Sequence, residues 1–358
     1  MSAKRITSLD VAKKAGVSRT TVSFVLNNVT GMQISEETRK RVLQAARELG
    51  YVPDAAAQAL ASGRSKTVGL LMARHPHMIA SDMFLTQVLE VLVREVNQHG
   101  MRLLLQVVED FENRASYLKL VRSNSIDGIL YSGPRIEDAA LFSLVERGVP
   151  TVLMGTLPGS SYYSVDVDNR AAAQRACAHL LRLGHTRLAC LTNAGLSYSA
   201  AVDRLQGYKD ALEAAGIPLD YDLIRYGEFN PESGYFQMKY ILDATPPPTA
   251  VFVASDVVAY GAMEAIRERG LRIPEDIALV GFDDVPVSRY IEPSLTTIQL
   301  PVVELARQSC EMVVGLINGE QPAVPQVFLE ANLVVRKSCG AQKCHNSFGE
   351  TSTFWEIS

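Results

Sequence analysis

The 358 residues of this chain are too many for one small domain and enough for two or three, and an apolar content of 47% indicates a substantial core. The N-terminus lacks the apolar segment of a signal peptide, and no apolar run is long enough to span a bilayer, so we expect a cytoplasmic protein without a membrane partner. Charge is uneven: eleven basic and five acidic residues give the first 66 positions a net charge of +6, whereas the whole chain carries −4.

Two short helices are predicted at the start of the chain. Leu9, Val11 and Ala15 lie on one apolar face, which Gly16 ends as a C-cap. Ser18 then stands where the N-cap of a second periodic run is expected. Two helices joined by a glycine-containing turn are typical of the DNA-binding bihelical unit, whose second helix enters the major groove. The positive charge of this region supports binding to duplex DNA.

A third helix and a short alanine-rich segment follow. Ser35 is the predicted N-cap of a helix that runs to Leu49, and Gly50 stops it. The segment from Asp54 to Ser62 favours helix by composition but is too short to be stable alone. We therefore expect it to become helical only when something packs against it.

From Thr67 onward the pattern alternates between strands and helices. The predicted strands are the apolar runs at 68–73, 102–108, 128–132, 150–155, 187–192, 250–254 and 277–282. The predicted helices between them include 84–99, 170–183, 204–215 and 257–269. Buried parallel strands with crossover helices make an α/β body, which at this length should split into two lobes with a ligand crevice at the carboxyl ends of the strands.

No catalytic or metal-binding pattern is found. The sequence has no glycine-rich phosphate loop, no nucleophile elbow and no paired metal-ligand motif, so we expect neither an enzyme nor a cofactor. The odd number of scattered cysteines is typical of reduced thiols rather than of a disulfide framework; they are Cys177, Cys190, Cys310, Cys339 and Cys344. A solute-binding protein for transport would share such a body, but it should carry a signal peptide and no basic head.

The ordered motifs of the chain closely resemble those of the LacI/GalR family of bacterial repressors. They include Leu9-Asp-Val-Ala, Ala15-Gly-Val-Ser18, Leu49-Gly-Tyr51-Val-Pro53, Arg204-x-x-Gly207, Ala254-Ser-Asp256 and Val280-Gly-Phe-Asp283-Asp284. The resemblance covers about Arg5 to Ser338. It implies an all-α helix-turn-helix head, a hinge helix, and a two-lobed α/β body of the type I periplasmic-binding-protein kind. It also implies a homodimer or tetramer that binds a palindromic operator and is controlled by a small effector.

The resemblance assigns DNA contacts to the head. Arg19 and Thr20 match the specificity pair of the recognition helix, because arginine can bond bidentately to guanine and the threonine methyl can meet thymine. The alternative for Arg19 is a phosphate contact alone. The other expected DNA contacts in the head are Thr7, Ser18, Thr21, Ser23, Asn27 and Ser35. For Ser35, capping alone is the alternative.

In the hinge, Leu60 with Ala57 and Gln58 matches the positions that enter the minor groove. An apolar side chain there unstacks a central base step and bends the duplex.

For the effector, Arg204 and Asp283 match positions that bracket sugar hydroxyls, since arginine donates and aspartate accepts. Phe229 matches an aromatic platform for a sugar face, Phe84 a pocket-lining aromatic, and Ser255 a position that is Asn in some relatives. The alternatives are an ion pair between Arg204 and Asp283 and core packing for the two phenylalanines. Asp256 is expected to cap the following helix instead. The favoured effector is a sugar, with a purine or another metabolite as the alternative.

The predicted domains are a head at 1–53, a hinge and linker at 54–66, an effector-binding and dimerisation body at 67–338, and an irregular extension at 339–358.

Overall fold

The computed structural model describes residues 6–27, 33–52, 63–108, 117, 121 and 126–341. The chain divides into a head that runs to Lys66 and a body that begins at Thr67. Within the described ranges, no helix is both long and apolar enough to cross a membrane. The expected hinge helix from Asp54 to Ser62, with Ala57, Gln58 and Leu60, lies outside the described residues.

The described part of the head contains three helices, as the sequence predicts: α1 (Ser8–Ala15), α2 (Arg19–Leu26) and α3 (Glu36–Leu49). The predicted glycine C-caps of α1 and α3 are confirmed, because Gly16 and Gly50 have φ angles of 66° and 63°. These are left-handed conformations that other residues adopt at a cost, so the two glycines end their helices sharply.

The three helices pack around Val11, Val22 and Val42, which are fully buried. The prediction that Leu9 belongs to this apolar face is wrong, since half of its side chain is exposed. Successive helical residues are rotated by about 100°, which places Leu9 well off the face that Val11 and Ala15 share.

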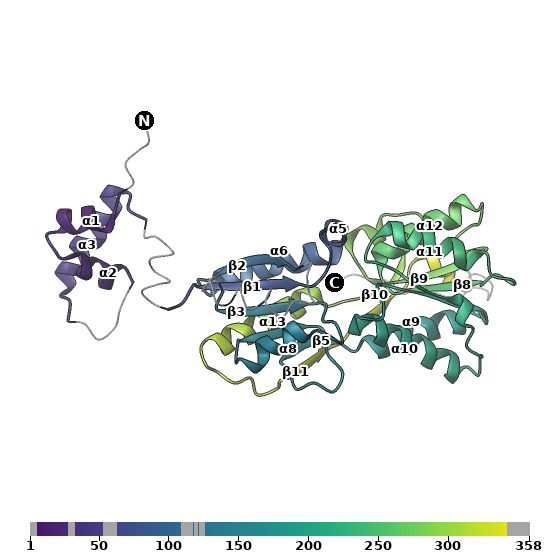
Figure 1. Cartoon of the computed structure of the whole chain (residues 1–358). Helices are drawn as coiled ribbons and strands as arrows, with labels where there is room; N and C mark the ends of the chain where they lie inside the picture. Colours follow the sequence, from purple (N-terminus) through teal and green to yellow (C-terminus); the bar gives the residue numbers. More distant parts are fainter. Residues whose placement is uncertain are drawn as a thin grey trace, which may run out of the picture. The chain divides into compact units, whose positions relative to one another are not determined.

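The body contains two six-stranded sheets, one in each lobe, with α-helices on their faces (Figure 1). In lobe 1 the strand order is β11-β5-β4-β3-β1-β2, and in lobe 2 it is β12-β10-β9-β8-β6-β7. The lobe 1 strands are β1 (Thr67–Met72), β2 (Arg102–Val107), β3 (Gly128–Ser132), β4 (Thr151–Met154), β5 (Ser164–Val167) and β11 (Gln326–Leu329). The lobe 2 strands are β6 (Leu188–Thr192), β7 (Ile224–Tyr226), β8 (Ala250–Val253), β9 (Ala278–Asp283), β10 (Thr296–Gln299) and β12 (Asn332–Val334).

The α-helices that lie wholly in the described part of the body are α5 (Pro76–Ala80), α6 (Met83–Gln98), α8 (Ala139–Glu146), α9 (Asn169–Arg182), α10 (Ser199–Ala214), α11 (Pro231–Leu242), α12 (Asp256–Glu268) and α13 (Val302–Ile317). In lobe 2, α9 and α10 cover one face of the sheet, and α11 and α12 cover the other (Figure 1). Side chains along β6 alternate accordingly: Leu188 and Cys190 pack with the α9 side, whereas Ala189 and Leu191 pack with the α11 side.

The chain crosses between the lobes three times, because β5 leads into α9, β10 leads into α13, and β11 leads into β12. The crossings lie at 168, 300–301 and 330–331. Both lobes therefore depend on distant parts of the sequence, and the carboxyl ends of their central strands point toward a shared crevice.

The predicted combination of helical head and two-lobed α/β body is confirmed, and each predicted strand is present within two residues at either end. The expectation of uniformly buried parallel strands is wrong at the edges: β12 runs antiparallel to β10, and β2 is an edge strand on which Leu105 is 40% exposed. The four cysteines in the described part are free, as predicted. Cys339 is buried in the core and Ala341 packs against it.

Candidate functional site

The start of α2 is the exposed polar corner of the head. Ser18 caps the helix by accepting a hydrogen bond from the Thr21 backbone N–H at 3.0 Å, and its hydroxyl is bonded to that of Thr21 at 2.9 Å. Arg19 and Thr20 follow as the first two helical residues, and both are exposed. The Arg19 Nε donates to the Ser8 hydroxyl at 3.0 Å, so a contact inside the head orients the guanidinium while leaving its other nitrogens available.

The remaining expected DNA contacts of the head also have structural partners. Thr7 forms a capping box with Asp10 at the start of α1, and Ser35 caps α3 by accepting from the Thr38 backbone N–H. In α2, the Asn27 amide donates to the Ser23 hydroxyl at 3.2 Å. Ser18, Thr7 and Ser35 therefore each stand at a helix N-terminus, where backbone N–H groups favour anions such as phosphate.

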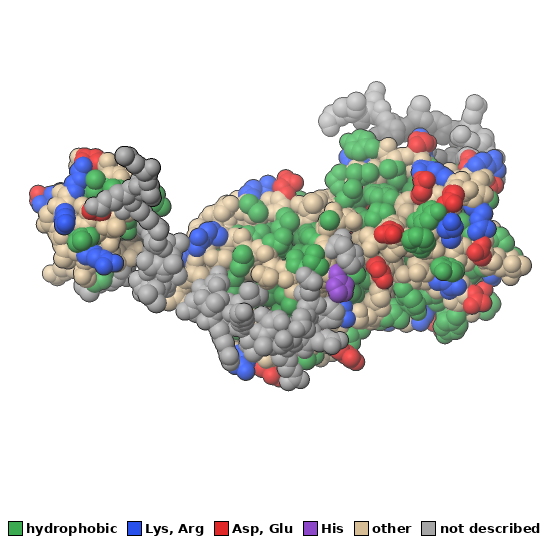
Figure 2. Space-filling model, turned by 45° about the horizontal axis from the view of Figure 1, so that its top comes forward, with side chains coloured by type: hydrophobic (Ala, Val, Ile, Leu, Met, Phe, Trp, Pro, Cys, Tyr) green, Lys and Arg blue, Asp and Glu red, His purple; other side chains and the backbone are tan. Residues whose placement is uncertain are grey.

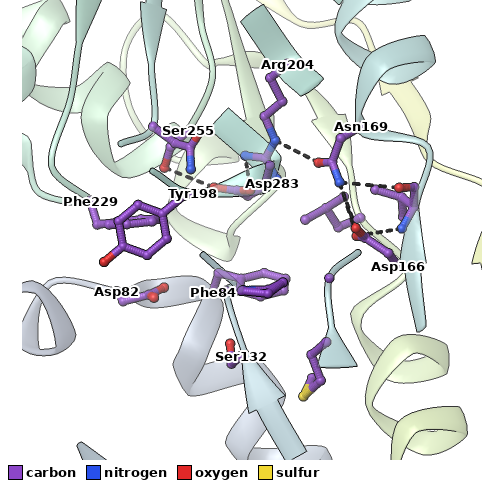
Figure 3. Close-up of a pocket in the computed structure, with 18 of the residues that line it drawn as sticks. Asp82, Phe84, Ser132, Asp166, Asn169, Tyr198, Arg204, Phe229, Ser255 and Asp283 are labelled. Carbon is purple, nitrogen blue, oxygen red and sulfur yellow. Dashed lines mark hydrogen bonds and ion pairs between the residues drawn. The ribbon is translucent and has the colours of Figure 1, made fainter. Parts of the chain in front are cut away.

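The body has a pocket between its lobes, and the five predicted effector contacts all line it: Phe84, Arg204, Phe229, Ser255 and Asp283. They come from positions far apart in the sequence, with Phe84 at the start of α6 in lobe 1 and the other four in lobe 2. Figure 3 shows Asp82, Phe84 and Ser132 of lobe 1 facing Arg204, Ser255 and Asp283 across the pocket.

Arg204 is a buried donor on α10. Its Nε donates to Asn169 Oδ1 at 2.8 Å, and its Nη1 donates to the Ala254 carbonyl at 2.7 Å (Figure 3). The guanidinium lies over the Phe282 ring at 3.7 Å from its centroid and forms an ion pair with Asp283 at 3.6 Å. Burial lowers the pKa of Arg204, and the neighbouring carboxylates oppose this shift. The group is therefore held in a fixed orientation at the pocket wall.

Asp283 is the acceptor beside it, at the end of β9. Its Oδ2 accepts from the Ser255 hydroxyl at 3.0 Å, and its backbone φ of 121° is unusual for a residue with a side chain. Burial raises the pKa of Asp283, and Arg204 partly offsets this. The ion pair, which was the alternative to effector binding, is present, and both residues that form it also line the pocket.

Asp166 and Asn169 extend this network, although the sequence reading did not single them out. The Asn169 amide donates to Asp166 at 3.1 Å, while its oxygen accepts from Arg204. Burial raises the pKa of Asp166 to about 6. The signal in the sequence was available: Val165-Asp-Val167-Asp-Asn169 places a carboxylate inside an apolar strand, where a buried charge requires partners.

The sequence analysis also did not point to the residues that surround Phe229. Arg74, which follows β1, forms an ion pair with Asp82 at 2.6 Å and lies over the Phe229 ring at 4.7 Å from its centroid. Tyr198 packs edge-on against Phe229 at 5.1 Å and donates to the Ala73 carbonyl at 3.0 Å. Phe229 thus contacts both lobes, and the Arg74 guanidinium covers part of the ring face expected to hold a sugar.

The expectation that Asp256 caps α12 is wrong. Ser255 is the N-cap and Asp256 is already the first helical residue. The Asp256 carboxylate instead accepts from the Val285 backbone N–H at 3.1 Å, the Ser288 hydroxyl at 2.5 Å and the Thr297 hydroxyl at 2.6 Å. Asp256 therefore anchors the segment that follows Asp283, and burial raises its pKa.

The chain matches known proteins in both units. Residues 7–54 match the model of bacterial regulatory proteins of the lacI family, and residues 177–339 match that of periplasmic binding protein-like domains. The transcriptional regulator CelR of Thermobifida fusca is 34% identical over 92% of this chain and 96% of its own length.

Two solved structures extend the likeness to the fold. A complex of the transcriptional regulator CelR with cellobiose has a TM-score of 0.72 and 33% identity, over 93% of this chain and 100% of its own. The lac repressor dimer bound to operator and the anti-inducer ONPF has a TM-score of 0.82 and 29% identity, over 94% of this chain and 99% of its own.

Proposed function

This chain belongs to the LacI family of bacterial regulatory proteins, and from that membership we propose that it is a repressor whose effector is a neutral sugar bound between the two lobes. Like its relatives, it is a DNA-binding transcriptional regulator under the control of an effector. The relatives are regulators rather than enzymes, and we propose a regulatory role without catalysis. A protein that binds the bacterial chromosome acts in the cytoplasm, where we expect this one.

The observation that carries the sugar proposal is the pairing of opposite hydrogen-bonding roles at one wall of the pocket. Arg204 supplies N–H donors, and Asp283 supplies a carboxylate acceptor 3.6 Å away. A sugar hydroxyl both donates and accepts, so neighbouring hydroxyls can bond to both side chains. The cellobiose complex of the regulator CelR supports the same ligand class.

The charge of the pocket supports a neutral ligand. Its charged lining consists of Arg74, Asp82, Asp166, Arg204 and Asp283. Each arginine is paired with an aspartate, and the remaining aspartate leaves no excess of positive charge. Phosphorylated or carboxylated ligands therefore find no unpaired cation in the described lining.

The proposal is tested by calorimetry with cellobiose, glucose, galactose and ribose, followed by operator binding with and without the sugar that binds. Asp283→Asn should weaken sugar binding and blunt the operator response, because it removes the charged acceptor while keeping the shape of the side chain. Asp138→Asn is the matched control, since Asp138 is also buried but does not line this pocket. If Asp283→Asn and Arg204→Ala both bound the sugar as tightly as the wild type does, the effector site would lie elsewhere.

We also propose that two heads of a homodimer read a palindromic operator, because one head contacts only a few base pairs. The proposed base contacts are Arg19 and Thr20, with the helix-capping residues of the head at phosphates. The hinge contacts of Leu60, Ala57 and Gln58 stay part of this proposal.

A further inference from the structure

Two residues that line the effector pocket each carry a buried polar side-chain atom without a hydrogen-bond partner. Among the described residues, the buried side-chain atoms without a partner are Arg74 Nε, Gln87 Nε2, Ser164 Oγ and Asn193 Oδ1. Arg74 and Asn193 line the pocket, and they are 5% and 3% exposed. A buried polar group without a partner destabilises the folded protein, so a pair of them in one pocket calls for an explanation by function.

The two residues occupy equivalent places in the two lobes. Arg74 comes two residues after β1, and Asn193 comes directly after β6. These strands hold the same position in the order of their sheets, next to the edge strands β2 and β7. Both side chains thus start at the carboxyl end of a corresponding strand, one in each lobe, where ligands of α/β sheets bind.

Phe229 connects the two positions. Its backbone N–H donates to the Asn193 carbonyl at 2.9 Å, and its ring lies under the Arg74 guanidinium. Figure 3 shows Phe229 on one side of the Arg204–Asp283 pair and Asp166 on the other. Arg74 and Asn193 therefore belong to the Phe229 end of the pocket, apart from the groups that the sequence motifs identify.

We propose that Arg74 and Asn193 form a second polar subsite that binds a hydroxyl group at one end of a neutral sugar; this rests on the proposed function. Arg74 Nε donates to the hydroxyl oxygen, and Asn193 Oδ1 accepts from a hydroxyl hydrogen. The ion pair with Asp82 at 2.6 Å neutralises the arginine, so this end selects a hydroxyl rather than an anion.

The subsite also connects ligand binding to the arrangement of the lobes. Arg74 belongs to lobe 1 and Asn193 to lobe 2, so a sugar bonded to both stabilises the arrangement in which they face one another. A ligand shifts a conformational equilibrium only by its difference in affinity for the two states, and contacts that exist in one state supply that difference.

The test measures affinity and stability in the same variants, with neutral sugars (cellobiose, glucose, galactose, ribose) and the nucleosides adenosine and cytidine as probes. Asn193→Ala removes the unpaired acceptor, and Arg74→Lys keeps a cation for Asp82 while it removes Nε. Each should weaken binding of the best probe at least about tenfold. The melting temperature of ligand-free Asn193→Ala should stay unchanged or rise, because the deleted oxygen has no partner to lose.

Ser164→Ala is the control, since Ser164 Oγ is an equally buried and unpartnered atom that does not line the pocket. It should leave affinity unchanged. If Asp283→Asn lost affinity while Asn193→Ala and Arg74→Lys kept it, the second subsite would be overturned and the proposed function would stand. If all three kept full affinity, both would fail. A protein that bound none of the neutral probes would also contradict a subsite for a neutral hydroxyl. So would a protein that bound only glucose 6-phosphate in a parallel titration.

Discussion

Strained backbone conformations gather at the effector pocket. Four described residues other than glycine have positive φ angles, and two of them, Phe229 and Asp283, line the pocket. Asp284, the next residue, is a third, and its carboxylate is bonded to Gln299 and Arg336. Such conformations persist only where surrounding contacts hold them, and here Asp283 lines the pocket while Asp284 turns to Gln299 and Arg336.

The raised pKa of Asp166 predicts that the free energy of unfolding depends on pH. Its pKa is raised to about 6 by burial, so between pH 4 and pH 6 the folded protein binds more protons at this site than the unfolded chain does. The free energy of unfolding should therefore fall as pH rises through this window, by roughly 3 kcal/mol from this residue, and should be flat above it. Urea titrations from pH 4 to 8 on wild type and Asp166→Asn measure the difference. Parallel pH profiles for the two proteins would contradict it.

Arg19 predicts base-specific recognition. Arg19→Ala should cost about 1–3 kcal/mol at the bases that the guanidinium contacts and relax the preference there. Arg47→Ala is a matched control, because Arg47 is an exposed basic residue at the end of α3. Binding-site selection on both variants is the measurement, and an unaltered preferred sequence for Arg19→Ala would remove Arg19 as a base reader.

At the scale of elements, glycines set how closely the helices of lobe 2 approach. A Cβ added to Gly261 of α12 would lie 1.7 Å from the Pro231 carbonyl oxygen of α11. One added to Gly234 of α11 would lie 1.9 Å from the Val258 carbonyl oxygen of α12. The two helices therefore pack backbone against backbone, and the obstructing atoms cannot rotate away. This contact supports α12, whose N-cap Ser255 lines the pocket.

Gly261→Ala should consequently destabilise the body by about 2–3 kcal/mol through overpacking. Gly315→Ala is the control, since Gly315 is also helical but an added Cβ would only touch the Glu320 side chain at 3.4 Å. That variant should gain about 0.5–1 kcal/mol from helix propensity. Chemical denaturation of both variants gives the comparison, and opposite signs are the expected result.

At the scale of the molecule, the described residues of the body include exposed apolar side chains on both lobes. Val93 on α6 and Leu105 on β2 are exposed in lobe 1, and Phe236 and Tyr240 on α11 are exposed in lobe 2. Figure 2 shows hydrophobic side chains over both lobes on the side that carries α6 and α11. Exposed apolar patches of this kind mark interaction surfaces, and a second copy of the chain is the partner that the proposed palindromic operator would require.

Phe236→Glu should therefore weaken dimerisation at least tenfold, because it places a charge in an apolar interface. Phe328→Glu is the control: Phe328 is similarly exposed, but it lies on β11 at the opposite edge of the lobe 1 sheet. Sedimentation velocity over a concentration series distinguishes them. Equal dissociation constants for the two variants would move the dimer interface away from α11.

The sequence by itself determined the helical head, the caps Gly16, Ser18 and Ser35, and the alternation of strands and helices in the body, since these depend on local periodicity and capping chemistry. The resemblance to the LacI/GalR family pointed to Arg204 and Asp283, and both line the pocket. Only the tertiary structure showed that Arg74 contacts Asp82 and Phe229, and it reassigned Asp256 from helix cap to anchor of a neighbouring loop. Phe229 lies in the other lobe, and the partners of Asp256 lie in the loop after β9 and in β10, so these contacts arise from long-range chain connections that no local pattern encodes.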